Sequence, residues 1–156
     1  MSKSYGCDCI LIIIAALSVN QADEIYSEAL KENGVVHAYI VHSDDGMDEI
    51  SPFDKTNVVE LKEGVIKQFS IDPKNLGLNS TKRENIKGKN AKYNSEKIIE
   101  IYKGKNNEFS QSVALNVAAG LIVSGKENDY KVAFEKASSH LNSGNVFQHL
   151  VKIQSF

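Results

Sequence analysis

Arginine and cysteine are scarce in this chain of 156 residues, and each scarcity excludes a kind of chemistry. Arg83 is the only arginine, so bidentate arginine clamps on phosphate or carboxylate are almost absent. An enzyme that handles a phosphorylated substrate must then use lysine, backbone N–H groups or a metal. Cys7 and Cys9 are the only cysteines, which is too few for a disulfide framework, and their spacing is a poor metal signal. Buried, reduced thiols are expected, and they fit a cytoplasmic protein.

Strong net charge and long hydrophobic runs are also lacking. The formal net charge is -2, so nothing draws the whole chain toward nucleic acid or an anionic membrane. The longest apolar run, Ile10 to Leu17, is too short to span a bilayer and lacks the flanks of a signal peptide. Apolar residues make up 42% of the chain and charged residues 24%, which is typical of a globular domain with a proper core. We therefore expect neither a nucleic-acid partner nor a membrane partner.

The hydrophobic pattern predicts a single α/β domain over residues 1–156. Residues 9–17 resemble a strand covered on both faces, and a helix from Gln21 to Gly34 followed by a strand at 35–41 completes a βαβ unit. Residues 56–61 and 65–71 form a hairpin pattern. Four helices are expected after that, over residues 94–102, 111–124, 130–141 and 146–153. The predicted fold is a mostly parallel sheet flanked by helices, with a small hairpin and a helical C-terminal third.

The acidic loop after the second strand is the first candidate site. Asp44, Asp45, Asp48 and Glu49 lie within six residues, and such crowding is unfavourable unless the carboxylates are solvated or a cation neutralises them. Hard oxygen ligands of this kind suit Mg²⁺. A solvated acidic turn that caps a helix explains the same composition. His42, at the end of the strand, is a metal ligand, a base or, more simply, a hydrogen-bonded structural group.

The order of residues in this loop is more specific than its composition. Residues 41–51 read Val-His-x-x-x-Gly-x-Asp-Glu-Ile-Ser, and Thr56 and then Val-x-Glu-Leu-x-x-Gly follow at 58–64. This segment resembles the metal-binding segment of the anthranilate phosphoribosyltransferases, which belong to the nucleoside phosphorylase and phosphoribosyltransferase superfamily.

Later segments resemble that family in the same order. They are Ile71-Asp72-Pro73 with Leu76-Gly77-Leu78, the asparagine at Asn94, the Leu-Asn-x-Ala-Ala stretch at 115–119, and the Ser-Gly ending of the stretch 137–144. The resemblance runs from about Ile10 to the C-terminus. It implies the C-terminal half of the large glycosyltransferase domain of that family.

The resemblance also implies a function. The family transfers a phosphoribosyl group from phosphoribosyl pyrophosphate to anthranilate, in the amino-acid biosynthesis of tryptophan, and an Asp-Glu pair holds Mg²⁺ on the pyrophosphate. In this chain the matching metal ligands are Asp48 and Glu49. Asp45 stands where the family has no consistent ligand, and it is expected to lie behind the metal ligands without contacting the ion.

The departures from the family pattern limit this expectation. The chain lacks the N-terminal helical domain, the Gly-Thr-Gly-Gly-Asp phosphate loop, the Lys-His-Gly-Asn segment and the arginine that contacts anthranilate. Ser43 and the pair Lys89-Asn90 also depart from the family glycines. We expect a fragment that contains no catalytic residue, binds Mg²⁺ weakly and is inactive alone. A separate N-terminal half would complete it, and an uncovered apolar face would favour self-association.

Two alternatives stay open at this point. A fragment of a pyrimidine nucleoside phosphorylase is the first, because that related family has a similar Asp-Gly-x-Asp-Glu loop. The second is a non-catalytic, stand-alone domain, which the altered loop residues favour.

Overall fold

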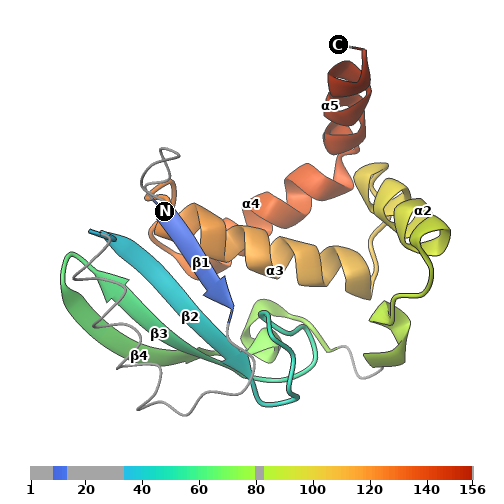
Figure 1. The fold of residues 1–156 in the computed structure, drawn as a ribbon. Helices are drawn as coiled ribbons and strands as arrows, with labels where there is room; N and C mark the ends of the chain where they lie inside the picture. Colours follow the sequence, from blue (N-terminus) through green and yellow to red (C-terminus); the bar gives the residue numbers. More distant parts are fainter. Residues whose placement is uncertain (1–8, 14–33, 80–82, 156) are drawn as a thin grey trace.

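The computed structural model of the chain describes residues 9–13, 34–79 and 83–155 (Figure 1). The first predicted strand is present as β1 (Cys9–Ile13). The remainder of that predicted strand and the helix predicted from Gln21 lie outside the described residues.

The described sheet has four strands in the order β1-β2-β3-β4. The other three strands are β2 (His37–Ser43), β3 (Thr56–Lys62) and β4 (Val65–Ile71). β1 and β2 pair in parallel, whereas β2–β3 and β3–β4 pair antiparallel. The expectation of a mostly parallel sheet is therefore not confirmed within the described strands; the α/β class and the hairpin are.

The connections explain these strand directions. Glu63 and Gly64 form a two-residue turn with φ angles of 51° and 80°, and so short a connection can join only antiparallel neighbours. The stretch 44–55 between β2 and β3 contains no helix, and a parallel neighbour needs a crossover of a dozen or more residues, usually through a helix. The parallel reading came from the βαβ pattern and holds only for the β1–β2 pair.

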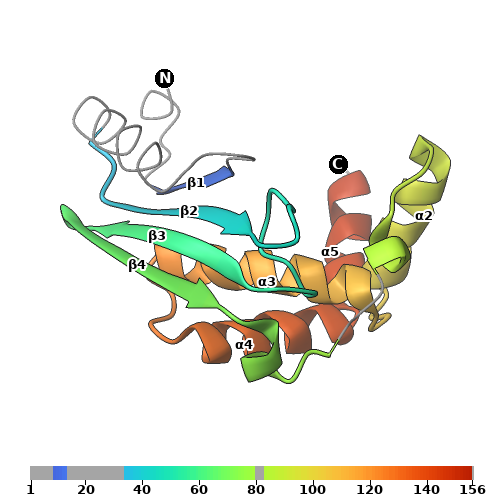
Figure 2. The ribbon, with the colours of Figure 1, turned by 90° about the horizontal axis from the view of Figure 1, so that it is seen from below.

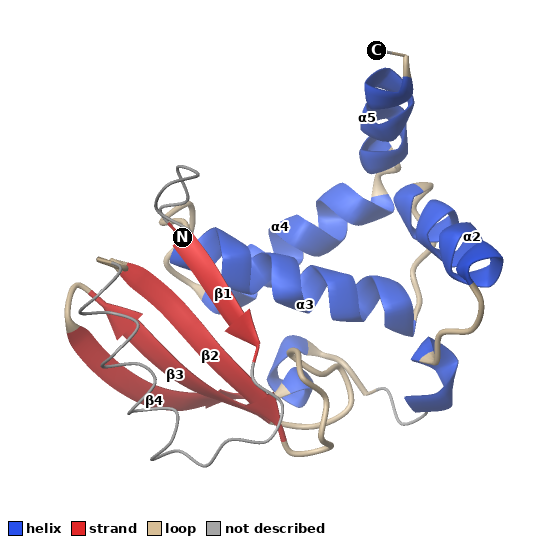
Figure 3. Cartoon of the chain, in the orientation of Figure 1, coloured by secondary structure: helices blue, strands red, loops and turns tan. Residues whose placement is uncertain are grey.

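The C-terminal part is helical, as predicted (Figure 3). Two 3₁₀ turns, η2 (Pro73–Leu76) and η3 (Arg83–Ile86), lead into α2 (Ala91–Tyr102), α3 (Glu108–Val123), α4 (Tyr130–Asn142) and α5 (Asn145–Gln154). α2 and α3 begin about one turn earlier than the hydrophobic pattern indicates. Asn90 and Asn107 accept hydrogen bonds from the first turns of these helices, so polar caps rather than apolar residues set their starts.

α3 and α4 lie against one face of the sheet (Figure 2). Tyr39 and Val41 of β2 pack there with Leu115 of α3 and Phe134 of α4 in one buried cluster. Tyr130, at the start of α4, donates a hydrogen bond from its hydroxyl to the backbone oxygen of Leu115 at 2.7 Å. Burial, and then the neighbouring Tyr39, raise the pKa of Tyr130, which keeps this hydroxyl a donor. α4 is thereby fixed on α3.

One side of α3 is exposed, although its sequence predicts a fully buried helix. Leu115 and Ala119 are completely buried, but Val113 is 39% exposed and Val117 47% exposed. α2 and α5 extend beyond the far end of α3, away from the sheet (Figure 1). Of the helices that the structure describes, none is long and apolar enough to cross a membrane.

Candidate metal site

The acidic loop begins where β2 ends, at the carboxyl edge of the strand, and it returns to β3 at Thr56. Backbone hydrogen bonds close its base, from Gly46 N–H to the Ser43 oxygen (2.9 Å) and from Asp44 N–H to the Lys55 oxygen (2.8 Å). Gly46 has a φ of 80°, a conformation that favours glycine. The loop is therefore held in shape by its own backbone.

Asp45 lies inside the loop and holds it together. Its two carboxylate oxygens accept hydrogen bonds from Met47 N–H (3.0 Å) and from the Ser51 hydroxyl (2.8 Å). Burial acts to raise the pKa of Asp45, but the hydrogen bonds from Met47 and Ser51, together with Ser43 and the charge of Arg83, lower it overall. Asp45 therefore supports the loop in its ionised form.

Asp44 is also engaged within the protein. Its Oδ1 accepts a hydrogen bond from the side-chain amide of Asn57 at 2.8 Å, on the exposed start of β3. Two of the four carboxylates thus serve the loop itself, which leaves Asp48 and Glu49.

Asp48 and Glu49 line an open depression of roughly 560 Å³. Asp48 is exposed and Glu49 is partly buried. Burial, and then the charge of Asp48, raise the pKa of Glu49. Two neighbouring carboxylates, one of them short of solvent, repel each other, and a divalent cation would relieve that repulsion.

Asn116 of α3 fixes the position of Glu49 from 67 residues away in the sequence. Its amide nitrogen lies 3.2 Å from Glu49 Oε2, 3.2 Å from the Ile50 oxygen and 3.0 Å from the Ser112 oxygen. Its amide oxygen accepts from Ile50 N–H at 3.1 Å. Sequence analysis noted Asn116 as part of a helix motif but missed this role, because only the fold brings α3 to the loop.

The donor set fits a hard divalent cation in part. Carboxylate oxygens are the ligands that Mg²⁺ prefers, and Mg²⁺ is usually held by one or two carboxylates, with water and phosphate oxygens supplying the other positions. Among the described residues there is no group of three or more His, Cys, Asp or Glu side chains that could hold a metal. The described residues therefore provide only part of a coordination sphere.

Basic side chains line the same depression. Arg83 and Lys87 line it together with Glu84 and Ile86, and Arg83 Nη1 donates to the Asp45 backbone oxygen at 2.5 Å. The only arginine of the chain thus lies beside the acidic loop, 38 residues from its partner. No local motif in the sequence predicts the contact between Arg83 and Asp45.

His42 does not behave as a fully hydrogen-bonded structural group. Its Nδ1 is buried and has no hydrogen-bond partner. The residue does not line the depression that contains Asp48 and Glu49, so the structure does not bring it together with the two carboxylates as a metal ligand.

The sequence and the fold of the chain match one family. The sequence pattern of the glycosyl transferase family, a/b domain, matches residues 11–147. The chain belongs to this family.

Individual relatives are more specific. The chain is 46% identical over 132 residues to the anthranilate phosphoribosyltransferase of Pelagibacter ubique, and the alignment covers 85% of this chain and 40% of that protein. It is 38% identical over 133 residues to the enzyme of Azospirillum brasilense, and that alignment covers 83% of this chain and 38% of that enzyme. The chain is thus similar to the C-terminal part of these enzymes and spans about two-fifths of their length.

Solved structures show the same relationship. Anthranilate phosphoribosyltransferase from Thermus thermophilus superposes with a TM-score of 0.73 at 26% identity, over 86% of this chain and 39% of that one. The Saccharomyces cerevisiae enzyme in complex with PRPP and Mg superposes with a TM-score of 0.75 at 24% identity, over 90% and 40%. These comparisons favour the anthranilate phosphoribosyltransferase hypothesis over the pyrimidine nucleoside phosphorylase one.

Proposed function

We propose that this chain is the part of an anthranilate phosphoribosyltransferase that receives Mg²⁺ and the pyrophosphate of phosphoribosyl pyrophosphate. The observation that supports this most directly is that Asp48 and Glu49 line the depression, with Glu49 held by Asn116, while Asp44 and Asp45 are engaged in the loop. A relative of the same fold is known in complex with PRPP and Mg, and the curated relatives are named for the same reaction.

Each residue has a distinct task in this proposal. Asp48 and Glu49 supply two carboxylates to the ion, and Asn116 holds Glu49 through a contact with its Oε2 at 3.2 Å. A bound Mg²⁺ would neutralise negative charge that develops on the leaving pyrophosphate. Arg83 and Lys87, which line the same depression, offer positive charge to the same phosphate oxygens. Carboxylates and basic side chains around one depression suit a metal–polyanion pair better than either ion alone.

Other parts of the enzyme position phosphoribosyl pyrophosphate and bind anthranilate. The chain contains no glycine-rich phosphate loop, whose backbone N–H groups could position the substrate, and no arginine for anthranilate. Phosphoribosyl pyrophosphate and anthranilate are therefore substrates of the complete enzyme, in tryptophan biosynthesis. We place that enzyme in the cytoplasm.

Magnesium titration tests the metal ligands. The amide signals of residues 42–51 should shift with a Kd of about 1 mM, or roughly 4 kcal/mol, because two carboxylates leave most of the coordination sphere to water. Asp48→Asn and Glu49→Gln should abolish the shifts. Asp54→Asn, an exposed carboxylate that accepts from its neighbour Lys55, is the matched control and should leave them unchanged. Micromolar binding that survives both site variants would show that Asp44 and Asp45 hold the ion.

A chimera tests the reaction itself. This chain replaces the 132-residue aligned segment of the Pelagibacter ubique enzyme, and anthranilate consumption is followed by fluorescence. Turnover that depends on Asp48 and Glu49 but not on Asp54 is the expected result. A folded chimera that binds Mg²⁺ without turnover would favour the non-catalytic domain instead.

A further inference from the structure

The guanidinium of Arg83 contacts the backbone of the acidic loop. Arg83 is the first residue of the 3₁₀ turn η3, 38 residues from Asp45, and its Nη1 donates a hydrogen bond to the Asp45 backbone oxygen at 2.5 Å. Within the described part of the chain, no ion pair joins Arg83 to a carboxylate. An arginine that contacts a carbonyl in a loop of four carboxylates therefore does more than neutralise charge.

The Asp45 carbonyl belongs to a tight turn that leads to the proposed metal ligands. Gly46 N–H donates to the Ser43 oxygen at 2.9 Å, and Met47 N–H donates to Asp45 Oδ1 at 3.0 Å. Asp48 follows directly in the sequence. Gly46 has no side chain to restrict its backbone, so a contact from outside the turn helps to keep it in one conformation.

The two proposed metal ligands are held from different elements. Asn116 of α3 contacts Glu49 Oε2 at 3.2 Å, which fixes the second carboxylate. The Asp48 carboxylate accepts no hydrogen bond from the described residues, so the turn before it sets its position. Arg83 ties that turn to η3. The arrangement of the two carboxylates therefore depends on one contact from α3 and one from η3.

Lys87 provides a comparison within the same depression. It lies four residues after Arg83 and also lines the depression, but its side chain makes no hydrogen bond or ion pair with the described residues of the acidic loop. A positive charge near a cation site repels the cation. If charge alone matters, removal of either side chain should strengthen Mg²⁺ binding. If the contact with Asp45 matters, removal of Arg83 should weaken it.

From these observations we propose that Arg83 is a positioning residue for the metal loop. Through the Asp45 backbone oxygen it holds the turn in the conformation in which Asp48 and Glu49 can bind one divalent cation. In the absence of phosphate, its own charge repels the ion, so its benefit to metal binding comes through the loop. The proposal rests on the proposed function, in which these two carboxylates receive Mg²⁺, and it adds a contact that sets their arrangement.

Magnesium titration without phosphate tests the proposal, with the amide signals of residues 42–51 as the readout. Arg83→Met keeps most of the side-chain length but removes both the charge and the hydrogen bond. It should weaken Mg²⁺ binding by about threefold, the scale of one hydrogen bond. Lys87→Met removes the same charge without that hydrogen bond, and it should strengthen binding by roughly twofold. All of these side chains are exposed, so the variants should keep the wild-type circular dichroism.

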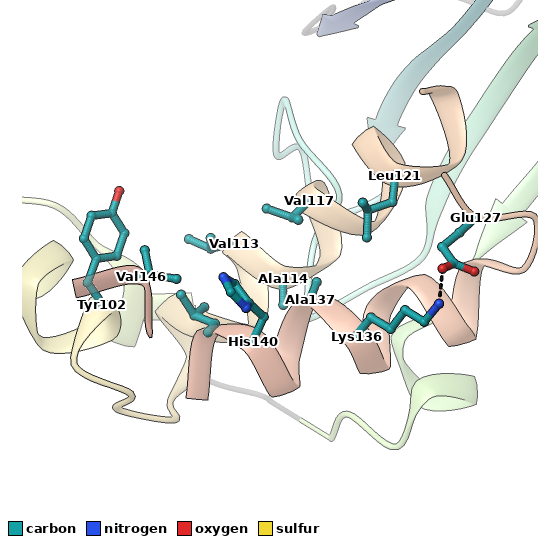
Figure 4. Close-up of a pocket in the computed structure, with 11 residues that line it drawn as sticks. Tyr102, Val113, Ala114, Val117, Leu121, Glu127, Lys136, Ala137, His140 and Val146 are labelled. Carbon is teal, nitrogen blue, oxygen red and sulfur yellow. Dashed lines mark hydrogen bonds and ion pairs between the residues drawn. The ribbon is translucent and has the colours of Figure 1, made fainter. Parts of the chain in front are cut away.

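Lys136→Met controls for the change in net charge. Lys136 of α4 pairs with Glu127 in the apolar groove between α3 and α4 (Figure 4), and it does not line the depression. Its replacement should leave the affinity unchanged. Arg83→Lys keeps the charge and a donor group, and it should restore most of the wild-type affinity. An Arg83→Met chain that binds Mg²⁺ as tightly as wild type, or more tightly, would overturn the proposal.

A second measurement needs no metal. Hydrogen exchange of the Gly46 and Met47 amides should be about threefold faster in metal-free Arg83→Met and unchanged in Lys87→Met, because only the first variant releases the turn. Unchanged exchange in both variants would likewise overturn the proposal. If wild type shows no Mg²⁺-dependent shift, the proposed metal function fails, and the exchange rates still decide whether Arg83 holds the turn.

Discussion

Two neighbouring residues of α3, Asn116 and Val117, have contrasting surroundings. Asn116 makes four hydrogen bonds or close polar contacts and completes the acidic loop. Val117 lines the apolar groove between α3 and α4 and is 47% exposed. The two residues differ because an unpaired buried polar group and an exposed apolar side chain cost different amounts of free energy. A buried polar group without a partner costs about 1–3 kcal/mol and is satisfied locally, whereas apolar area can stay in water at about 25 cal/mol per Å² until another segment covers it.

The largest effect expected concerns activity. The isolated chain should show no phosphoribosyl transfer to anthranilate, because a completed polar loop cannot replace the positioning that the absent phosphate loop provides. The measurement is anthranilate fluorescence with excess phosphoribosyl pyrophosphate and Mg²⁺. Steady turnover by the pure chain would show that the loop region is sufficient, and the fragment interpretation would fail.

The two faces of α3 should differ strongly in stability. Leu115→Ala removes a completely buried side chain from the core and should lower the free energy of unfolding by about 3 kcal/mol. Val117→Ala should change it by less than about 0.5 kcal/mol, because that side chain is half exposed. Urea unfolding gives both values. Equal losses would mean that the groove is already filled in solution.

The stability of the acidic loop should depend on Asn116. Asn116→Ala leaves Ile50 N–H without its acceptor and should cost about 2 kcal/mol, with faster hydrogen exchange at Ile50 and weaker Mg²⁺ binding. Asn85→Ala is the matched control, since Asn85 makes one exposed side-chain hydrogen bond to Glu108. Equal destabilisation of Asn85→Ala and Asn116→Ala would show that the contact between Asn116 and the loop contributes no more to stability than an exposed hydrogen bond.

The smallest effect is a pH dependence at Glu49. Its pKa is raised in the folded chain by burial and then by Asp48, so the stability that comes from its protonated form is present at low pH and is lost as the pH rises through that pKa. Mg²⁺ needs the ionised form, so its affinity should fall as the pH drops through the same range. Asp48→Asn should bring the pKa of Glu49 down. Carboxyl ¹³C shifts measure both, and an unchanged Glu49 titration in Asp48→Asn would contradict the assigned cause.

The sequence was sufficient for features that depend on adjacent residues. The stretch from His42 to Ser51 was recognised as a candidate metal loop because the residues that resemble the family motif are contiguous, and Asp48 and Glu49 both line one depression. The metal itself stays a prediction. The four C-terminal helices were also predicted, although polar caps moved two of their starts, because apolar periodicity locates the buried stripe and not the first turn.

The tertiary structure alone decided which distant residues meet. Asn116 reaches the loop across 66 residues and Arg83 across 38, and neither contact leaves a local pattern in the sequence. Strand direction was decided in the same way, since a continuous apolar run indicates that a strand is buried and not which way its neighbour runs. The sequence of α3 determined that the helix is apolar all round. Only the packing of the sheet and α4 decided which stripe stays open, because apolar composition fixes how much surface must be covered and the fold fixes what covers it.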